Sequence, residues 1–208
     1  MRKLLALLCL LPAPLAAQKL QFMFGATGAQ EIVNSRIDPS SERLTGLVLG
    51  GEGQLTSGRF VARLRYAQGR VTAPAGGAEP RDIVEGEALF GIRVMPWLTL
   101  WGGPSARAYT SASSDRRWLF WSGRATARGE LLPGRMQTFV ELWGAFSGNV
   151  RDPAQKAGGS GAEAGLEMRL GGQSFWGRLA YRIESGHATG MRETVEATSL
   201  SLIYGLPQ

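Results

Sequence analysis

Hydrophobic and polar residues alternate along much of this 208-residue chain. In the segment 58–69, GRFVARLRYAQG, Leu64 and Tyr66 have one parity, and Arg63 and Arg65 have the other. Because side chains two residues apart lie on the same face of a β-strand, this segment is predicted to be a strand with one apolar and one cationic face. No long stretch shows the 3.6-residue period of an amphipathic helix, so the chain is predicted to be all-β.

The alternating segments are about ten residues long and are separated by Gly, Pro, Asn, Asp and Ser, as strands separated by turns are. We count ten such segments, and eight or twelve strands remain compatible with the pattern. The ten segments are Lys19–Gly28, Gly46–Leu55, Arg59–Gln68, Ile83–Val94, Leu98–Tyr109, Trp118–Leu131, Gln137–Ser147, Ala162–Leu170, Phe175–Glu184 and Val195–Leu206.

Short and long connections alternate along the chain. The short ones are 56–58, 95–97, 132–136 and 171–174, and the long polar ones are 29–43, 69–82, 111–117, 148–161 and 185–194. An up-and-down antiparallel β-barrel with short periplasmic turns and longer extracellular loops has this rhythm, with both termini at the periplasmic end. Strands of about ten residues also suit a tilted crossing of a bilayer, so a transmembrane barrel is predicted.

Sorting the strand residues by parity separates an apolar set from a charged set. The charged set contains Arg and Glu, which suit paired networks in a confined space, and almost no Lys or Asp. Alternation alone does not say which set faces inward, because a soluble lipid-binding barrel has the same pattern inverted. An interior lined by small residues such as Ala62, Ala88 and Ala125 would leave voids, whereas lipid chains conform to them. We therefore predict that the apolar set faces lipid and that the charged set fills the lumen.

Opposite charges on neighbouring strands are expected to pair inside such a barrel. The predicted ion-pair network of the lumen consists of Arg63, Arg65, Glu85, Glu87, Arg93, Arg107, Arg124, Arg128, Glu141, Glu163, Glu167, Arg169, Arg178 and Arg182. A barrel of this size with a crowded lumen is not expected to leave a wide aqueous pore.

The first 17 residues are predicted to be a signal peptide. Two basic residues precede the apolar run Leu4–Leu11, and cleavage is predicted after Ala17. The apolar run is shorter than the roughly 20 residues that a membrane-spanning helix needs. The only cysteine, Cys9, lies in this run, so the predicted barrel domain, residues 18–208, has no disulfide.

The net charge of +6 raises the question of an anionic partner. The arginines are spread along the strands and mixed with Glu, which argues against nucleic acid. The basic residues of the predicted loops either contact phosphate groups of outer-membrane lipids, including lipopolysaccharide, or serve ordinary solubility. They are Arg36, Arg43, Arg70, Arg81, Arg116, Arg117, Arg151, Lys156 and Arg192.

One segment carries residues that could do chemistry. His187, the only histidine, lies in the predicted loop 185–194 close to Ser185, Thr189 and Glu193. Serine, histidine and an acid are the groups of a hydrolase. No nucleophile elbow is present, however, and a short polar loop often contains such residues by chance, so no catalytic residue is predicted. The chain has no cluster of His or Cys that would bind a metal, and no cofactor is expected.

The exported precursor, the ten alternating strands and the long–short rhythm of connections resemble a small bacterial outer-membrane β-barrel. The resemblance covers the whole mature chain, is one of architecture, and implies a location in the outer membrane of a Gram-negative cell. Such barrels usually end in an aromatic residue, whereas this chain ends SLIYGLPQ, with Tyr204 as the nearest candidate. Omptin-type proteases also have ten strands, but this sequence has no Asp–His couple, and its predicted strands are too short to project far above the membrane.

We therefore expect a porin-like but non-enzymatic barrel with a structural or surface-interaction role. Three alternatives remain open: a narrow solute pore, an outer-membrane lipid hydrolase that uses His187, and a soluble periplasmic lipid-binding barrel.

Overall fold

A computed structural model describes residues 20–74, 79–112, 115–151, 154–171 and 174–205 of the chain. The predicted signal peptide with Cys9 and the last three residues lie outside these ranges. The strands are β1 (Leu20–Ile37), β2 (Ser40–Ser57), β3 (Phe60–Thr72), β4 (Arg81–Met95), β5 (Leu98–Thr110), β6 (Asp115–Leu132), β7 (Met136–Arg151), β8 (Gln155–Lys156), β9 (Gly158–Arg169), β10 (Phe175–Ala188) and β11 (Met191–Tyr204). Among the described residues there is no helix long and apolar enough to cross a membrane.

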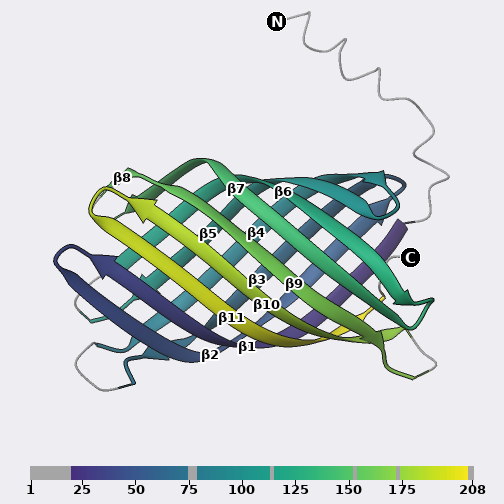
Figure 1. Cartoon of the computed structure of the whole chain (residues 1–208), viewed down its shortest axis with the longest axis horizontal. Coiled ribbons are helices and arrows are strands. Elements are labelled where there is room, and N and C mark those ends of the chain that lie inside the picture. The colour runs from purple at the N-terminus through teal and green to yellow at the C-terminus, as the bar shows by residue number, and fades with distance from the viewer. Residues whose placement is uncertain (1–19, 75–78, 113–114, 152–153, 172–173, 206–208) are drawn as a thin grey trace, which may run out of the picture.

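Ten long strands close into one antiparallel barrel (Figure 1). Consecutive long strands are neighbours, β1 pairs with β11, and the β6–β7 pairing completes the ring. The two-residue strand β8 pairs only with the end of β7, so β7 pairs directly with β9. This arrangement confirms the predicted all-β, ten-stranded, up-and-down fold.

The two ends of the barrel differ. At one end, here called the turn end, short turns join β2 to β3, β4 to β5, β6 to β7 and β9 to β10, and the described chain begins and ends there. At the other end, the loop end, β1 and β2 are joined at 38–39, and β10 and β11 at 189–190. Both of these connections were predicted to be long loops, and both are two-residue turns.

The prediction failed there because hydropathy does not alternate near the loop end of these strands. In β1, the buried inward residues are polar Glu31 and Ser35 with apolar Val33 between them, while Asn34 and Arg36 point outward, so the inner face is mixed and the outer face is polar. Strands β1, β2 and β6 have 18 residues each, nearly twice the 9–11 residues of a bilayer crossing. The expectation that the strands are too short to project beyond a membrane is therefore wrong.

The distribution of exposed side chains decides which face is inside. Leu64, Phe90 and Leu200 on the outer face are 64–72% exposed, whereas Arg63 and Glu141 on the inner face are at most 4% exposed. A soluble lipid-binding barrel would have the opposite arrangement, with its apolar side chains inside. The fold therefore has the faces of a transmembrane barrel, as predicted from parity.

Glycines make room for the large aromatic side chains of the interior. A Cβ atom added at Gly161 would lie 2.3 Å from Nε1 of Trp143, and one at Gly165 would lie 2.6 Å from the ring of Phe139. Both glycines belong to β9, and both aromatic side chains come from its neighbour β7. The glycine-rich sequence of β9 thus lets two rings lie flat against the barrel wall.

Candidate functional site

The interior of the barrel is built around two groups of ion pairs. The larger group, here called the turn-side network, consists of Glu52, Arg63, Arg65, Glu87, Arg124, Arg128, Glu141, Glu163, Glu167 and Arg178. It contains five guanidinium and five carboxylate groups, so their formal charges balance.

Glu141 is the best-connected carboxylate of the turn-side network. It accepts two hydrogen bonds of 2.9 Å from the guanidinium of Arg63, one of 3.2 Å from Arg124 and one of 2.7 Å from the hydroxyl of Thr126. Arg63 and Arg124 also pair with Glu87, at 3.0 and 2.6 Å. These groups come from β3, β4, β6 and β7, and Arg63 reaches Glu141 across the lumen, because β3 and β7 are not neighbours.

The rest of the turn-side network extends from β2 to β10. Arg178 pairs with Glu52 at 2.5 Å and with Glu167 at 2.7 Å, and Arg65 pairs with Glu52 at 3.3 Å and with Glu163 at 3.0 Å. Since Glu52 lies on β2 and Arg178 on β10, this part also bridges strands that are not adjacent. The charges therefore tie opposite walls together as well as neighbouring strands.

The second group, the loop-side network, consists of Glu31, Glu85, Arg107, Arg182, Glu184 and Glu193. Arg107 pairs with Glu85 at 2.5 Å and with Glu184, and Arg182 pairs with Glu31 and Glu85, both at 2.8 Å. Two guanidinium groups here face four carboxylates. Glu31 is 1% exposed, and its Oε2 atom accepts no hydrogen bond from any described residue.

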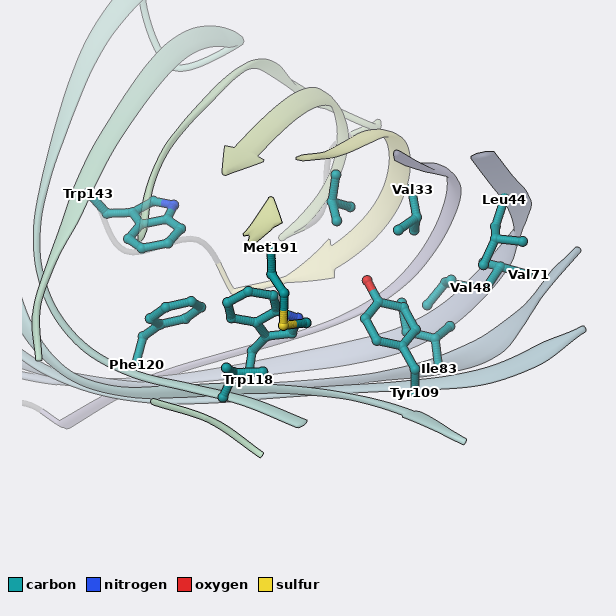
Figure 2. Packing of buried hydrophobic residues seen from close by; sticks show 12 residues of the cluster. Val33, Leu44, Val48, Val71, Ile83, Tyr109, Trp118, Phe120, Trp143 and Met191 are labelled. Atoms are coloured by element: carbon teal, nitrogen blue, oxygen red, sulfur yellow. The ribbon is translucent and has the colours of Figure 1, made fainter. Parts of the chain in front are cut away.

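A cluster of buried apolar side chains, here called the apolar plug, lies inside the barrel toward the loop end (Figure 2). It consists of Val33, Leu44, Val48, Val71, Ile83, Tyr109, Trp118, Phe120, Trp143, Val150, Met191 and Val195, which come from eight strands. Two polar tips are satisfied within it, since the Tyr109 hydroxyl and the Trp118 indole both donate to Glu193, at 2.9 and 3.2 Å, whereas Nε1 of Trp143 has no hydrogen-bond partner among the described residues. The plug is therefore anchored to the loop-side network through Glu193.

A chamber of about 130 Å³ lies inside the barrel. Side chains from both networks line it, including Glu52, Arg178, Glu31 and Arg182, and Phe120 of the plug contributes to its wall. Its volume is enough for several water molecules. Its lining combines the paired charges of both networks with apolar residues such as Val48 and Trp143, so the chamber has both polar and apolar walls.

The structure brings together twelve of the fourteen residues that were predicted to form the lumen network. The other two are Arg93, which among the described residues forms no ion pair, and Arg169, which lies over the ring of Trp176 at 6.0 Å. Four members of the two networks were not in the predicted set. Glu52 and Glu184 lie in predicted strands, whereas Glu31 and Glu193 lie in segments predicted to be loops. The parity that Glu31 shares with Val33, and Glu193 with Val195, was the only signal that could have placed these two glutamates on inward strand faces.

Glu193, the acid near His187 in the sequence, does not lie beside it in the structure. His187 is in β10 rather than in a loop, points outward, and lies opposite Arg192 and against Gly158. Glu193 points into the lumen, where Tyr109 and Trp118 bond it. The acid and the histidine of the hypothetical hydrolase are therefore on opposite sides of the barrel wall. No group of three or more His, Cys, Asp or Glu within the described ranges could hold a metal ion.

No protein-family model and no curated protein sequence matches this chain. Its fold is similar to that of the translocator domain of the autotransporter NalP from Neisseria meningitidis, with a TM-score of 0.52, 11% identity, and coverage of 99% of this chain and 94% of that one. It is also similar to the outer membrane protease OmpT from Escherichia coli, with a TM-score of 0.56, 8% identity, and coverage of 91% and 97%. The chain thus has the fold of a small bacterial outer-membrane β-barrel.

Proposed function

We propose that this protein is a non-enzymatic outer-membrane barrel that does not conduct solutes and has a structural or surface-interaction role. The observation that carries the proposal is the crowding of the lumen, where the paired charges of the two networks and the large buried side chains of the apolar plug lie together. The apolar outer face supports insertion in a bilayer, and the short turns support a periplasmic position for the turn end.

Cell fractionation tests the location. The full-length chain, expressed in a Gram-negative host, is expected in the outer-membrane fraction and is expected to need detergent for extraction, because large apolar side chains surround the barrel. Recovery from the soluble periplasm without detergent would refute the proposed location.

Planar-bilayer recording tests the closed lumen. Purified wild-type protein is expected to give no discrete openings, since water and ions would have to cross the apolar plug and displace paired buried charges. An open porin reconstituted in the same bilayers serves as the positive control. Regular unitary openings of the wild-type protein would instead support the narrow pore.

Hydrolysis assays test the absence of enzymatic activity. Wild-type protein and the His187→Ala variant are both expected to release lipid and peptide products only at the background rate. The reason is that Glu193 lies inside the barrel and that Asp38, the acid in the surface pocket of His187, is bonded to Arg36. Activity of the wild type that the His187→Ala change removes would contradict this assignment.

A further inference from the structure

Four basic side chains form a row on the outer face at the loop end. His187 of β10 lies opposite Arg192 of β11, and Arg192 lies opposite Arg36 of β1. Arg43 of β2 is two residues from Ser41, the partner of Arg36, and so is its diagonal neighbour. All four basic side chains are exposed, and we call them the basic arc.

The charges of the basic arc are not balanced by the protein. Arg192 and Arg36 face each other directly, an arrangement of like charges that destabilises a sheet. Asp38 accepts a hydrogen bond of 2.9 Å from Nε of Arg36, but within the described ranges neither Arg192 nor Arg43 forms an ion pair. In the lumen of the same barrel, the guanidinium groups of both networks face carboxylates. The basic arc therefore suits an anion from outside the protein.

A surface pocket lies beside the basic arc. It has a volume of about 360 Å³, and its lining includes the side chains of Arg36, His187 and Arg192 together with Asp38. Guanidinium groups bind phosphate through two parallel hydrogen bonds, which makes opposed arginines well suited to phosphate oxygens.

The height of the basic arc on the barrel points to a lipid as the source of the anion. Four residues toward the turn end, three of the four strands carry apolar outward side chains, namely Ile183, Ile32 and Leu47, and the fourth carries Glu196, which is bonded to Tyr181. Four residues of a tilted strand correspond to about 9 Å of height. Lipid headgroups begin at the edge of the hydrocarbon layer and extend about 5–8 Å beyond it, within reach of a long arginine side chain.

We propose that the basic arc binds the phosphate groups of an anionic lipid in the leaflet around the loop end of the barrel. This inference rests on the proposed position of the barrel in the outer membrane. The ligand is a phosphorylated lipid, whose acyl chains lie against the apolar outer face while its phosphates lie between the arginines.

Native mass spectrometry of the detergent-solubilised full-length protein tests the proposal. The probe is diphosphorylated lipid A, and the comparison lipid is the same molecule without phosphates. The double variant Arg36→Gln/Arg192→Gln is expected to bind the phosphorylated probe about tenfold more weakly than wild type, since it loses charge-assisted hydrogen bonds to phosphate. The matched control Arg59→Gln/Arg135→Gln, in turns at the turn end, is expected to bind like wild type.

Each outcome bears on the proposal. Equal binding by wild type and the Arg36→Gln/Arg192→Gln variant, or equal binding of the two lipids, would overturn it. Displacement of the lipid by an equal concentration of inorganic phosphate would show a free-phosphate site and would also overturn it. The folded-barrel band on a gel verifies that the variant is folded. Because binding is measured in detergent, its result is separate from that of cell fractionation, which tests the proposed location.

Discussion

Replacing Glu141 by Gln removes one charge from the centre of the turn-side network and leaves the shape of the side chain unchanged. The wild-type carboxylate is 2% exposed and accepts four hydrogen bonds, three of them from Arg63 and Arg124. In the variant these two guanidinium groups share only Glu87. Removing one partner of a buried ion pair costs about 3–5 kcal/mol, and we take about 3 kcal/mol because Glu87 remains.

A loss of about 3 kcal/mol corresponds to a fall of about 6–12 °C in unfolding temperature for a domain of this size. The measurement is the temperature at which the detergent-resistant folded band is lost on a gel. Glu130→Gln is the matched control, because Glu130 is an exposed residue at the end of β6 that pairs with the turn end of β7. The double variant Arg63→Gln/Glu141→Gln should lose less stability than the sum of the two single changes. If Glu141→Gln unfolds within 2 °C of Glu130→Gln, the ion-paired lumen does not hold the barrel together.

Two other substitutions test separately how charge balance and side-chain packing contribute to stability. The Glu31→Gln variant is expected to unfold within about 2 °C of wild type. The substitution removes one of the surplus carboxylates near Arg182 and keeps an oxygen that accepts the hydrogen bond from Arg182. A fall in unfolding temperature as large as that of Glu141→Gln would contradict this expectation. Gly161→Ala is expected to lower the free energy of unfolding by about 1–3 kcal/mol, because the added methyl group pushes the Trp143 ring from the wall. Gly144→Ala, whose Cβ would meet nothing within 4 Å, is the control in the same assay. Equal unfolding temperatures of the two variants would contradict the close approach of Trp143 to Gly161.

Period-2 alternation was enough to predict the ten strands and the faces of most of them. It works where one face meets a uniformly apolar environment, as in β3, where Leu64 and Tyr66 are exposed and Arg63 is buried. It fails toward the loop end, where the outer face is polar and the inner face mixes polar and apolar residues, so the predicted loops 29–43 and 185–194 are largely strand. The length of an alternating segment therefore measures the part of a strand whose outer face is apolar. It underestimates the length of the whole strand.

Parity predicted most of the residues that point into the lumen, but it did not predict which of them pair with each other. A pair on neighbouring strands such as Arg107 with Glu85 is of the kind expected from the sheet, whereas Arg63 with Glu141 depends on how the barrel curves and how wide it is. A strand register specifies which residues are opposite on adjacent strands and says nothing of residues across a lumen. The division into a balanced and a carboxylate-rich network likewise depended on Glu31 and Glu193, which lay in the predicted loops.

The arginines of the lumen and those of the outer face have opposite electrostatic surroundings. In the lumen, guanidinium groups such as those of Arg63 and Arg178 each lie between two carboxylates, and several of these pairs bridge strands that are not neighbours, so the barrel cannot widen without separating buried charges. On the outer face at the loop end, Arg36 and Arg192 oppose each other, and among the described residues Asp38 is the one acid that pairs with either of them. An exposed pair of like charges is tolerable in water, where screening is strong, and becomes favourable where the surroundings supply anions. The interior charges thus account for a closed barrel, and the exterior charges are those that a phosphate-rich layer of lipid headgroups would neutralise.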